Sequence, residues 1–334
     1  MSLPVGEGRP GPVLARVAIF WGAAALLVVV GFVVTVVTLN ATVYSASGVA
    51  RSYVAAVDRG DVGSALALAG VEPGDGDGDA LLTVPSKGGV DDVHALDDVD
   101  LGEGVHAVTL AYTVDGDEAQ SQFVLQQAAS RFGVFHAWRF ADAPVALLDV
   151  TPQNDPRFRV DGRTVTAAQE DVATRYRVLA PSVLELDHES SWLEATSRRV
   201  VVPSVGGTVS ASVDTRAKES FVRTVQDDLD RFLEEDCLPQ QVLLPAGCPF
   251  GRQVDDRVLS DPVWTMTELP TVTIEPTPTP GQWQVPAVPG TAHVQLDARR
   301  LFDGSRYTVD EDVAFTVSYL ITIGTDDAVS IEAR

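Results

Sequence analysis

The chain has 334 residues, of which 45% are hydrophobic and 21% charged, a composition that supports a folded core and excludes a wholly disordered chain. Its 47 acidic residues outnumber 24 basic ones, which argues against a nucleic-acid partner because phosphate binding needs a surplus of cations. The two cysteines exclude a disulfide-dense small domain and a multi-cysteine metal cluster.

The first predicted element is a membrane-spanning helix at 17–39, which is apolar and carries no charged residue. A bilayer core of about 30 Å needs about 20 such residues in a helix. Arg9 and Arg16 precede this segment against one acidic residue, Glu7, and positive charge is retained on the cytoplasmic side. We therefore expect residues 1–16 to form a cytoplasmic tail and the rest of the chain to lie outside the cell membrane.

A cleaved signal peptide is the alternative for this segment. Its apolar region typically has about 7–15 residues and ends in a small-x-small cleavage site. The apolar run here is longer, and Val43 and Ser45 form the best, but poor, pair of positions for cleavage. The sequence thus favours an uncleaved anchor. The part of the chain that follows this anchor contains 22 basic and 46 acidic residues. A body with that charge is repelled by anionic lipid head groups and should stand away from the membrane.

Helical patterns open the next predicted unit, at 45–143. Apolar residues recur at four-residue spacing from Val49 to Val57, which is typical of one face of a helix. A second, short helix is predicted between Asp61, a suitable N-cap, and Gly70, a suitable terminator.

Three strands are predicted after these helices. Residues 105–114 alternate in polarity, Asp115-Gly116 is a hairpin turn signal, and the chain returns through 118–127. A third strand is predicted at 132–140. Helices followed by an antiparallel sheet indicate the α+β class.

This order of elements resembles the nuclear-transport-factor-2-like cone fold, in particular its small membrane-anchored versions in actinobacterial envelope proteins. The resemblance is carried by YVAAVDRGD at 53–61, by the helix after it, and by VFHAWRF at 134–140. It implies a conical sheet with a cavity. Because members of that family include binding modules, accessory domains and some enzymes, the resemblance does not decide the function.

Two further units are predicted. Residues 147–207 contain short apolar runs around an Asp-Gly turn and indicate a small β-rich module, similar to a sandwich. The last unit, at 213–334, begins with a predicted helix at 215–235 and continues as strands. Its order of helix and sheet suggests a second, degenerate cone. The apolar face of the predicted helix consists of Phe221, Val225, Leu229 and Phe232.

The two cysteines, Cys237 and Cys248, lie outside the membrane in the predicted topology, where oxidising conditions favour a disulfide. Closing so short a loop stabilises the fold by roughly 2–3 kcal/mol in the chain-entropy model. The alternative is a reactive or metal-binding pair, but no histidine lies near these cysteines in the sequence.

The repeat Asp75-Gly-Asp77-Gly-Asp79 matches the start of a calcium-binding EF-hand loop. The match then fails, because Ala80 replaces the required glycine and Ser86 the bidentate glutamate. We interpret the segment as a flexible acidic loop, with weak attraction of calcium as the alternative, and predict no metal site and no cofactor.

Four residues are candidates for ligand binding. Alternation places His106 and Tyr112 on the apolar face of one strand, and His136 and Trp138 on the apolar face of another together with Phe132, Val134 and Phe140. In a cone fold this face lines the cavity, where a buried imidazole can act as a general base or bind a polar group. Neither histidine has an evident carboxylate partner in register on these strands.

No catalytic motif stands out. The sequence has no G-x-S-x-G, no S-x-x-K, no P-loop and no dinucleotide fingerprint. The leading hypothesis is therefore a single-pass, membrane-anchored envelope protein whose non-enzymatic ectodomain binds a protein partner or ligand, or acts as an accessory or sensory subunit. The alternatives are a cone-cavity enzyme with His106 or His136 as its base, and a structural spacer.

Overall fold

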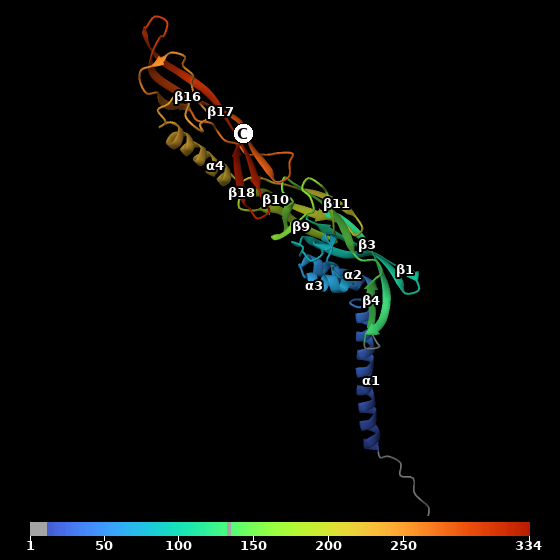
Figure 1. Cartoon of the computed structure of the whole chain (residues 1–334). Coiled ribbons are helices and arrows are strands. Elements are labelled where there is room, and N and C mark those ends of the chain that lie inside the picture. The colour runs from blue at the N-terminus through green and yellow to red at the C-terminus, as the bar shows by residue number, and fades with distance from the viewer. Residues whose placement is uncertain (1–11, 132–134) are drawn as a thin grey trace, which may run out of the picture.

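The computed structural model describes residues 12–131 and 135–334 and belongs to the α+β class. A single apolar helix stands apart at one end, and an elongated body made mostly of strands extends away from it (Figure 1). The hairpin of β16 and β17 reaches the end of the body farthest from this helix (Figure 1).

Helix α1 spans Pro12–Ala41, and its segment Ile19–Ala41 is long and apolar enough to cross a membrane. No part of its most apolar window is buried against the rest of the chain. The structure thus confirms an apolar helix at 17–39. A helix of this kind serves either as a membrane span or as a signal sequence. Residues 1–11 of the predicted tail lie outside the described residues.

Two helices and a four-stranded antiparallel sheet follow α1. The sheet has the order β1-β2-β3-β4 and packs its inner face against α2. Asp61 caps α3 by accepting a hydrogen bond from the Ser64 N–H, and Gly70 ends this helix in the left-handed conformation at φ 67°, as predicted. The elements are α2 Ala46–Asp58, α3 Val62–Ala69, the 3₁₀ turn η1 Asp77–Asp79, β1 Val90–Gly102, β2 Val105–Val114, β3 Asp117–Arg131 and β4 Phe135–Phe140.

The strand β1 was not predicted from the sequence. It forms one edge of the sheet and has almost all of its residues exposed, so its sequence lacks the alternation of a half-buried strand. The predicted strands at 105–114 and 118–127 correspond to β2 and β3. Strand β4 corresponds to residues 135–140 of the predicted strand 132–140, and Phe132 and Val134 lie outside the described residues.

Two sheets enclose the next hydrophobic core. One has the order β12-β10-β9-β6-β7 and the other β11-β5-β8, in which β11 and β5 are parallel. Buried side chains of both sheets form one cluster, which also includes Ala211 and Val213, beyond residue 207. The elements are β5 Val145–Gln153, β6 Arg157–Val160, β7 Arg163–Thr166, β8 Thr174–Leu179, β9 Ser182–Glu189, β10 Leu193–Val202, β11 Thr208–Asp214 and β12 Arg216–Ala217.

The last core lies between α4 and a sheet built around the β16–β17 hairpin. The predicted helix 215–235 begins later than expected, at Glu219, because Arg216 and Ala217 pair with β10. Cys237 and Cys248 form the predicted disulfide. The elements are α4 Glu219–Arg231, the π-helical turn η2 Phe232–Cys237, β13 Arg257–Val258, β14 Val263–Glu268, β15 Glu275–Pro276, β16 Gln282–Arg299, β17 Arg306–Ile323 and β18 Val329–Ala333.

Hydrogen bonds tie the three cores to one another. The hydroxyl of Tyr53 lies 2.8 Å from the carbonyl oxygen of Pro144 and 3.0 Å from that of Ala180, which joins α2 to the ends of β5 and β8. At the next joint, Arg157 of β6 donates from Nη1 to Oδ1 of Asp327 over 2.8 Å. These bonds hold the body in one extended arrangement.

Candidate functional site

Two of the four predicted site residues meet at one end of the first sheet. The rings of His106 and Trp138 pack edge to face, with 4.8 Å between their centroids. They come from β2 and β4, which flank β3, and they are brought together because β3 pairs with both strands in register. This end of the sheet faces α1 (Figure 1).

His106 also has a carboxylate partner that the sequence did not reveal. Its Nδ1 lies 2.6 Å from Oδ1 of Asp98 on β1, with the imidazole 25% and the carboxylate 34% exposed. The sequence analysis found no carboxylate partner on the strands of the two histidines, and Asp98 lies on β1, which was missing from the predicted sheet. Within the described residues, Nε2 of His106 makes no hydrogen bond. The carboxylate fixes the orientation of the ring and leaves Nε2 accessible.

The end of α1 and the residues after it are bound to β4. The indole Nε1 of Trp138 donates a hydrogen bond to the carbonyl oxygen of Tyr44 over 2.9 Å, and the rings of Tyr44 and Phe135 lie 4.7 Å apart. The backbone N–H of His136 donates to Oδ1 of Asn40 over 3.0 Å. We call this set of contacts, made by Asn40, Tyr44, Phe135, His136 and Trp138, the helix–sheet joint.

The side chain of His136 is exposed, which corrects the expectation of a buried imidazole. The register between β3 and β4 is irregular between Ala137 and Phe135, and burial does not alternate along β4 as predicted. His136 lies at this irregularity, where the strand meets the end of α1, and its side chain has solvent instead of a core beside it. His136 therefore contributes its backbone to the helix–sheet joint and is not brought to the pair of His106 and Trp138.

Tyr112 is placed elsewhere, in the contact between the first and second cores. Its buried hydroxyl donates to the carbonyl oxygen of Pro203 over 2.9 Å and lies 2.5 Å from Oγ of Ser121, which in turn accepts from the N–H of Val205. Burial raises the pKa of Tyr112 to about 12, so the phenol is neutral and serves as a structural donor.

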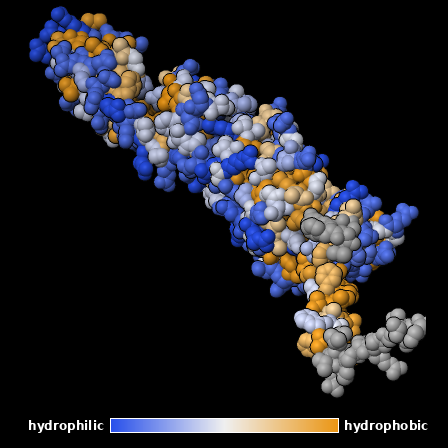
Figure 2. Space-filling model, turned by 90° about the horizontal axis from the view of Figure 1, so that it is seen from below, coloured by the Kyte–Doolittle hydropathy of each residue, from blue (hydrophilic) through white to orange (hydrophobic). Residues whose placement is uncertain are grey.

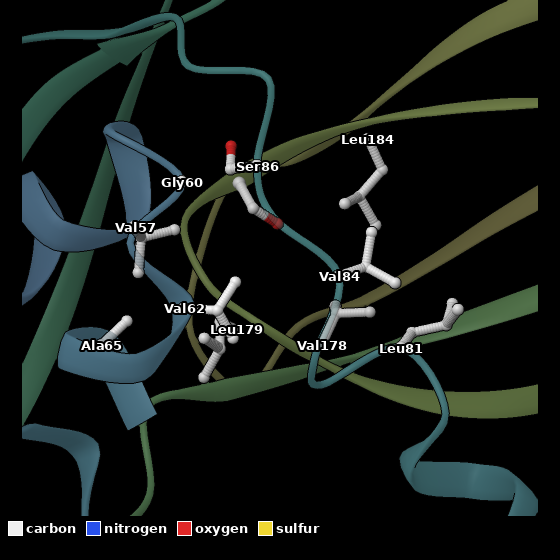
Figure 3. A pocket seen from close by; sticks show the side chains of 11 residues that line it. Val57, Gly60, Val62, Ala65, Leu81, Val84, Ser86, Val178, Leu179 and Leu184 are labelled. Atoms are coloured by element: carbon white, nitrogen blue, oxygen red, sulfur yellow. The ribbon is translucent and has the colours of Figure 1, made fainter. Parts of the chain in front are cut away.

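The apolar face predicted to line a cavity is a packed core. The side chains on this face beyond His106 are buried in one cluster with Tyr53 and its neighbours on α2, and six of them are at most 2% exposed: Val108, Leu110, Tyr112, Val114, Phe123 and Leu125. A cavity is present on another side, between the α2–α3 helices, the segment 81–86, and β8 and β9 (Figure 3). Its volume is about 10 Å³, which accommodates at most one water molecule and no organic ligand.

The acidic repeat also has a structural partner. Both carboxylate oxygens of Asp79 bind the guanidinium of Arg177 on β8, and one accepts a hydrogen bond from the Gly74 N–H. The hydrogen bonds from Arg177 hold the pKa of Asp79 below its usual value. Asp79 thus ties the acidic loop to the second core.

No known protein family, curated protein or solved structure matches this chain.

Proposed function

We propose that the chain is a single-pass membrane protein with a cytoplasmic N-terminus, and that its body is a non-enzymatic ectodomain at a bacterial cell envelope. We further propose that the first unit is a nuclear-transport-factor-2-like cone and that the ectodomain binds a partner protein as an accessory or sensory subunit. The observation that carries this proposal is the helix–sheet joint, which attaches the folded body directly to the end of an unburied apolar helix.

The joint favours an uncleaved helix over a signal peptide. Cleavage after Ser45 would remove Asn40 and Tyr44, and with them the acceptors for the His136 N–H and the Trp138 indole. Since Trp138 is only partly buried, its N–H would then be left to solvent and the packing of Tyr44 on Phe135 would be lost. A helix that stays attached keeps all of these contacts.

The surface of the body supports an extracytoplasmic role. Apolar side chains gather on α1 and beside it, whereas most of the body seen in Figure 2 is hydrophilic. An acidic, elongated body on an apolar helix is suited to hold a binding surface away from anionic lipids.

The pair of Asp98 and His106 favours one further candidate function. A carboxylate that orients an imidazole is the arrangement found in general bases, and Trp138 beside it offers an apolar surface to a substrate. In this alternative His106 is the base, because His136 makes no such pair. Replacing His106 with Gln should abolish an activity of this kind without loss of the fold.

Topology is tested with the full-length chain in intact cells. Cysteines introduced at Ser2 and at exposed Val172 are probed with a membrane-impermeant thiol reagent. We expect labelling of residue 172 in intact cells, labelling of residue 2 only after permeabilisation, and a protein that retains its first forty residues. The matched control is Val43→Ala, which converts the weak site at Val43 and Ser45 into a small-x-small site and should release the body. Recovery of the unaltered chain from the medium without α1 would refute the proposal.

A further inference from the structure

A rigid turn closes the long hairpin at the end of the body farthest from α1. Strands β16 and β17 have 18 residues each, so the hairpin is about 60 Å long. Arg300 and Ser305 bracket the turn, with the Arg300 N–H bonded to the Ser305 carbonyl over 2.9 Å and the Gly304 N–H bonded to the Arg300 carbonyl over 3.0 Å. We call residues 300–305 the distal turn.

The distal turn exposes two large apolar side chains. Phe302 is 99% and Leu301 is 72% exposed. Their backbone is held from two sides, because the Leu301 N–H donates to Asp256 over 3.1 Å and Asp303 accepts from both the N–H and the hydroxyl of Ser305. Apolar side chains held in this way lose little conformational entropy when they bind, which is a feature of residues that dominate interface energies.

Three arginines form a row behind the turn. Arg257, Arg299 and Arg306 lie opposite one another on β13, β16 and β17, so their side chains emerge on the same face of the sheet. Within the described residues, none of the three makes an ion pair, and Nε of Arg299 is buried without a hydrogen-bond partner. Like charges directly opposite one another destabilise a sheet, so an anionic group bound against the row from outside would stabilise the arrangement.

We propose that the distal turn and this arginine row dock a partner protein whose apolar pocket receives Phe302 and whose rim carries carboxylates opposite the arginines. The inference rests on the proposed function in one respect: the bilayer must lie at the opposite end of the body, so that the turn points away from it. Apolar side chains are visible among hydrophilic ones at this far end in Figure 2.

Two other occupants fit less well. Copies anchored in one membrane stand parallel, and a contact between their distal turns would bring two arginine rows together. An anionic lipid surface would interact with all charges at this end of the body together. The five aspartates at 255–261 and 297–306 outnumber the four arginines, so the net effect would be repulsion. A protein pocket contacts Phe302 and the arginine row selectively, which favours it over both.

The test places a photo-reactive phenylalanine at position 302 of the full-length chain in its native membrane. The control carries the same residue at Val172, which is exposed on the second unit. We expect one discrete protein adduct from position 302 and none from position 172. The captured protein is then purified and its affinity for the full-length chain in detergent micelles is measured.

Three variants make the binding measurement specific. Phe302→Ala should weaken binding about 10- to 100-fold, as for an anchor residue at the centre of an interface. Combined Arg257→Glu and Arg306→Glu should weaken it by at least about tenfold, and replacing the facing carboxylates of the partner with lysine should restore it. Val172→Ala should leave the affinity unchanged, and circular dichroism of each variant checks the fold.

The outcomes separate this inference from the proposed function. An adduct with a second copy of the chain overturns the inference and favours self-association. An adduct with lipid overturns it and favours a lipid surface, as does flotation on vesicles of phosphatidylglycerol and phosphatidylcholine that depends on Phe302. The absence of an adduct in cells where residue 172 is labelled from outside also overturns it, while the topology stands. Release of the chain into the medium without α1 would instead refute the proposed membrane anchoring. If the released chain still bound the purified partner, docking at the distal turn would be independent of that anchoring.

Discussion

The indole of Trp138 and the backbone carbonyl of Tyr44 are joined by a hydrogen bond of 2.9 Å, although 94 residues separate them in the chain. The bond links the last strand of the first sheet to the residues that follow α1. Together with the bond from His136 to Asn40, it makes the helix and the body one mechanical unit.

We predict that Trp138→Phe loosens this joint without unfolding the body. The smaller ring keeps part of the packing but loses the donor, at a cost of about 1 kcal/mol. Amide hydrogen exchange at 42–46 should accelerate in the full-length protein. Trp192→Phe is the matched control, because its indole donates to the carbonyl of Asp327 at the other joint. Equal effects of both variants at 42–46 would contradict the prediction.

Tyr53→Phe should destabilise the contact between the first and second cores. The change removes the hydroxyl that donates to the buried carbonyls of Pro144 and Ala180, although the Pro144 carbonyl keeps a bond from the Ala180 N–H. We expect a cost of about 1–3 kcal/mol, measured by urea unfolding at pH 7. Tyr319→Phe is the control, since the Tyr319 hydroxyl makes no hydrogen bond within the described residues and the change should be nearly neutral.

Tyr53 also predicts how stability changes in alkali. Burial raises the pKa of Tyr53 well above its ordinary value of 10, because the neutral phenol is favoured in the folded state. The contribution of Tyr53 to the free energy of unfolding is therefore complete below pH 10. It is lost as the pH rises further, because the phenol ionises at a lower pH in the unfolded chain than in the folded protein. Absorbance at 295 nm should show this tyrosine ionising only on unfolding, and titration in the folded protein near pH 10 would disprove the assignment.

Removal of the disulfide should destabilise the last core. The double variant Cys237→Ala and Cys248→Ala releases a loop with a sequence separation of 11 residues. In the chain-entropy model this costs about 2–3 kcal/mol, seen as a lower midpoint of thermal unfolding. Reduction of the unaltered protein should lower the midpoint in the same direction. An unchanged midpoint in both experiments would show that the loop is held by its other contacts.

Acid should weaken the joint between the second and third cores. Burial alone would raise the pKa of Asp327, but hydrogen bonds from Ser191 and Arg157 outweigh it and leave the pKa below the ordinary 3.8. The stabilisation is therefore complete above pH 3.8 and is lost as the pH falls through the lower folded value. Asp327→Asn should cost about 1–2 kcal/mol at pH 7 by weakening these bonds and should reduce the acid dependence.

Unfolding followed between pH 2 and 7 checks this prediction. Asp214→Asn, at an exposed position on β11, is the control and should keep both the stability and the acid dependence of the unaltered protein. If Asp327→Asn keeps the acid dependence as well, other carboxylates hold this joint.

The sequence correctly predicted those elements that depend on residues close to one another in the chain. The cap at Asp61, the terminator Gly70 and the alternation of 105–114 each depend on neighbouring residues, and each is present in the structure. Strand β1 escaped prediction because an exposed edge strand needs no apolar face. Its Asp98, the partner of His106, was missed for the same reason, although the turn at Gly102–Gly104 offered a signal.

The contacts that define the candidate site are not local. Alternation placed His136 on the apolar face, but β4 is irregular at this residue, and its exposure depends on where the end of α1 meets the strand, which no sequence pattern encodes. Tyr112 was predicted to line a cavity and instead binds Pro203, because the packing of the first unit against the second decides its surroundings. A pairing between strands or cores must be known before such residues are assigned a role.

The helix–sheet joint has a consequence for how far the body reaches. In a bilayer, the inclination of an apolar helix adjusts to the thickness of the hydrocarbon layer. In the proposed membrane topology, a change in that inclination tilts the whole body, because Asn40 and Tyr44 fix the sheet to the end of α1. The lipid composition would then change the distance between Phe302 and the membrane surface.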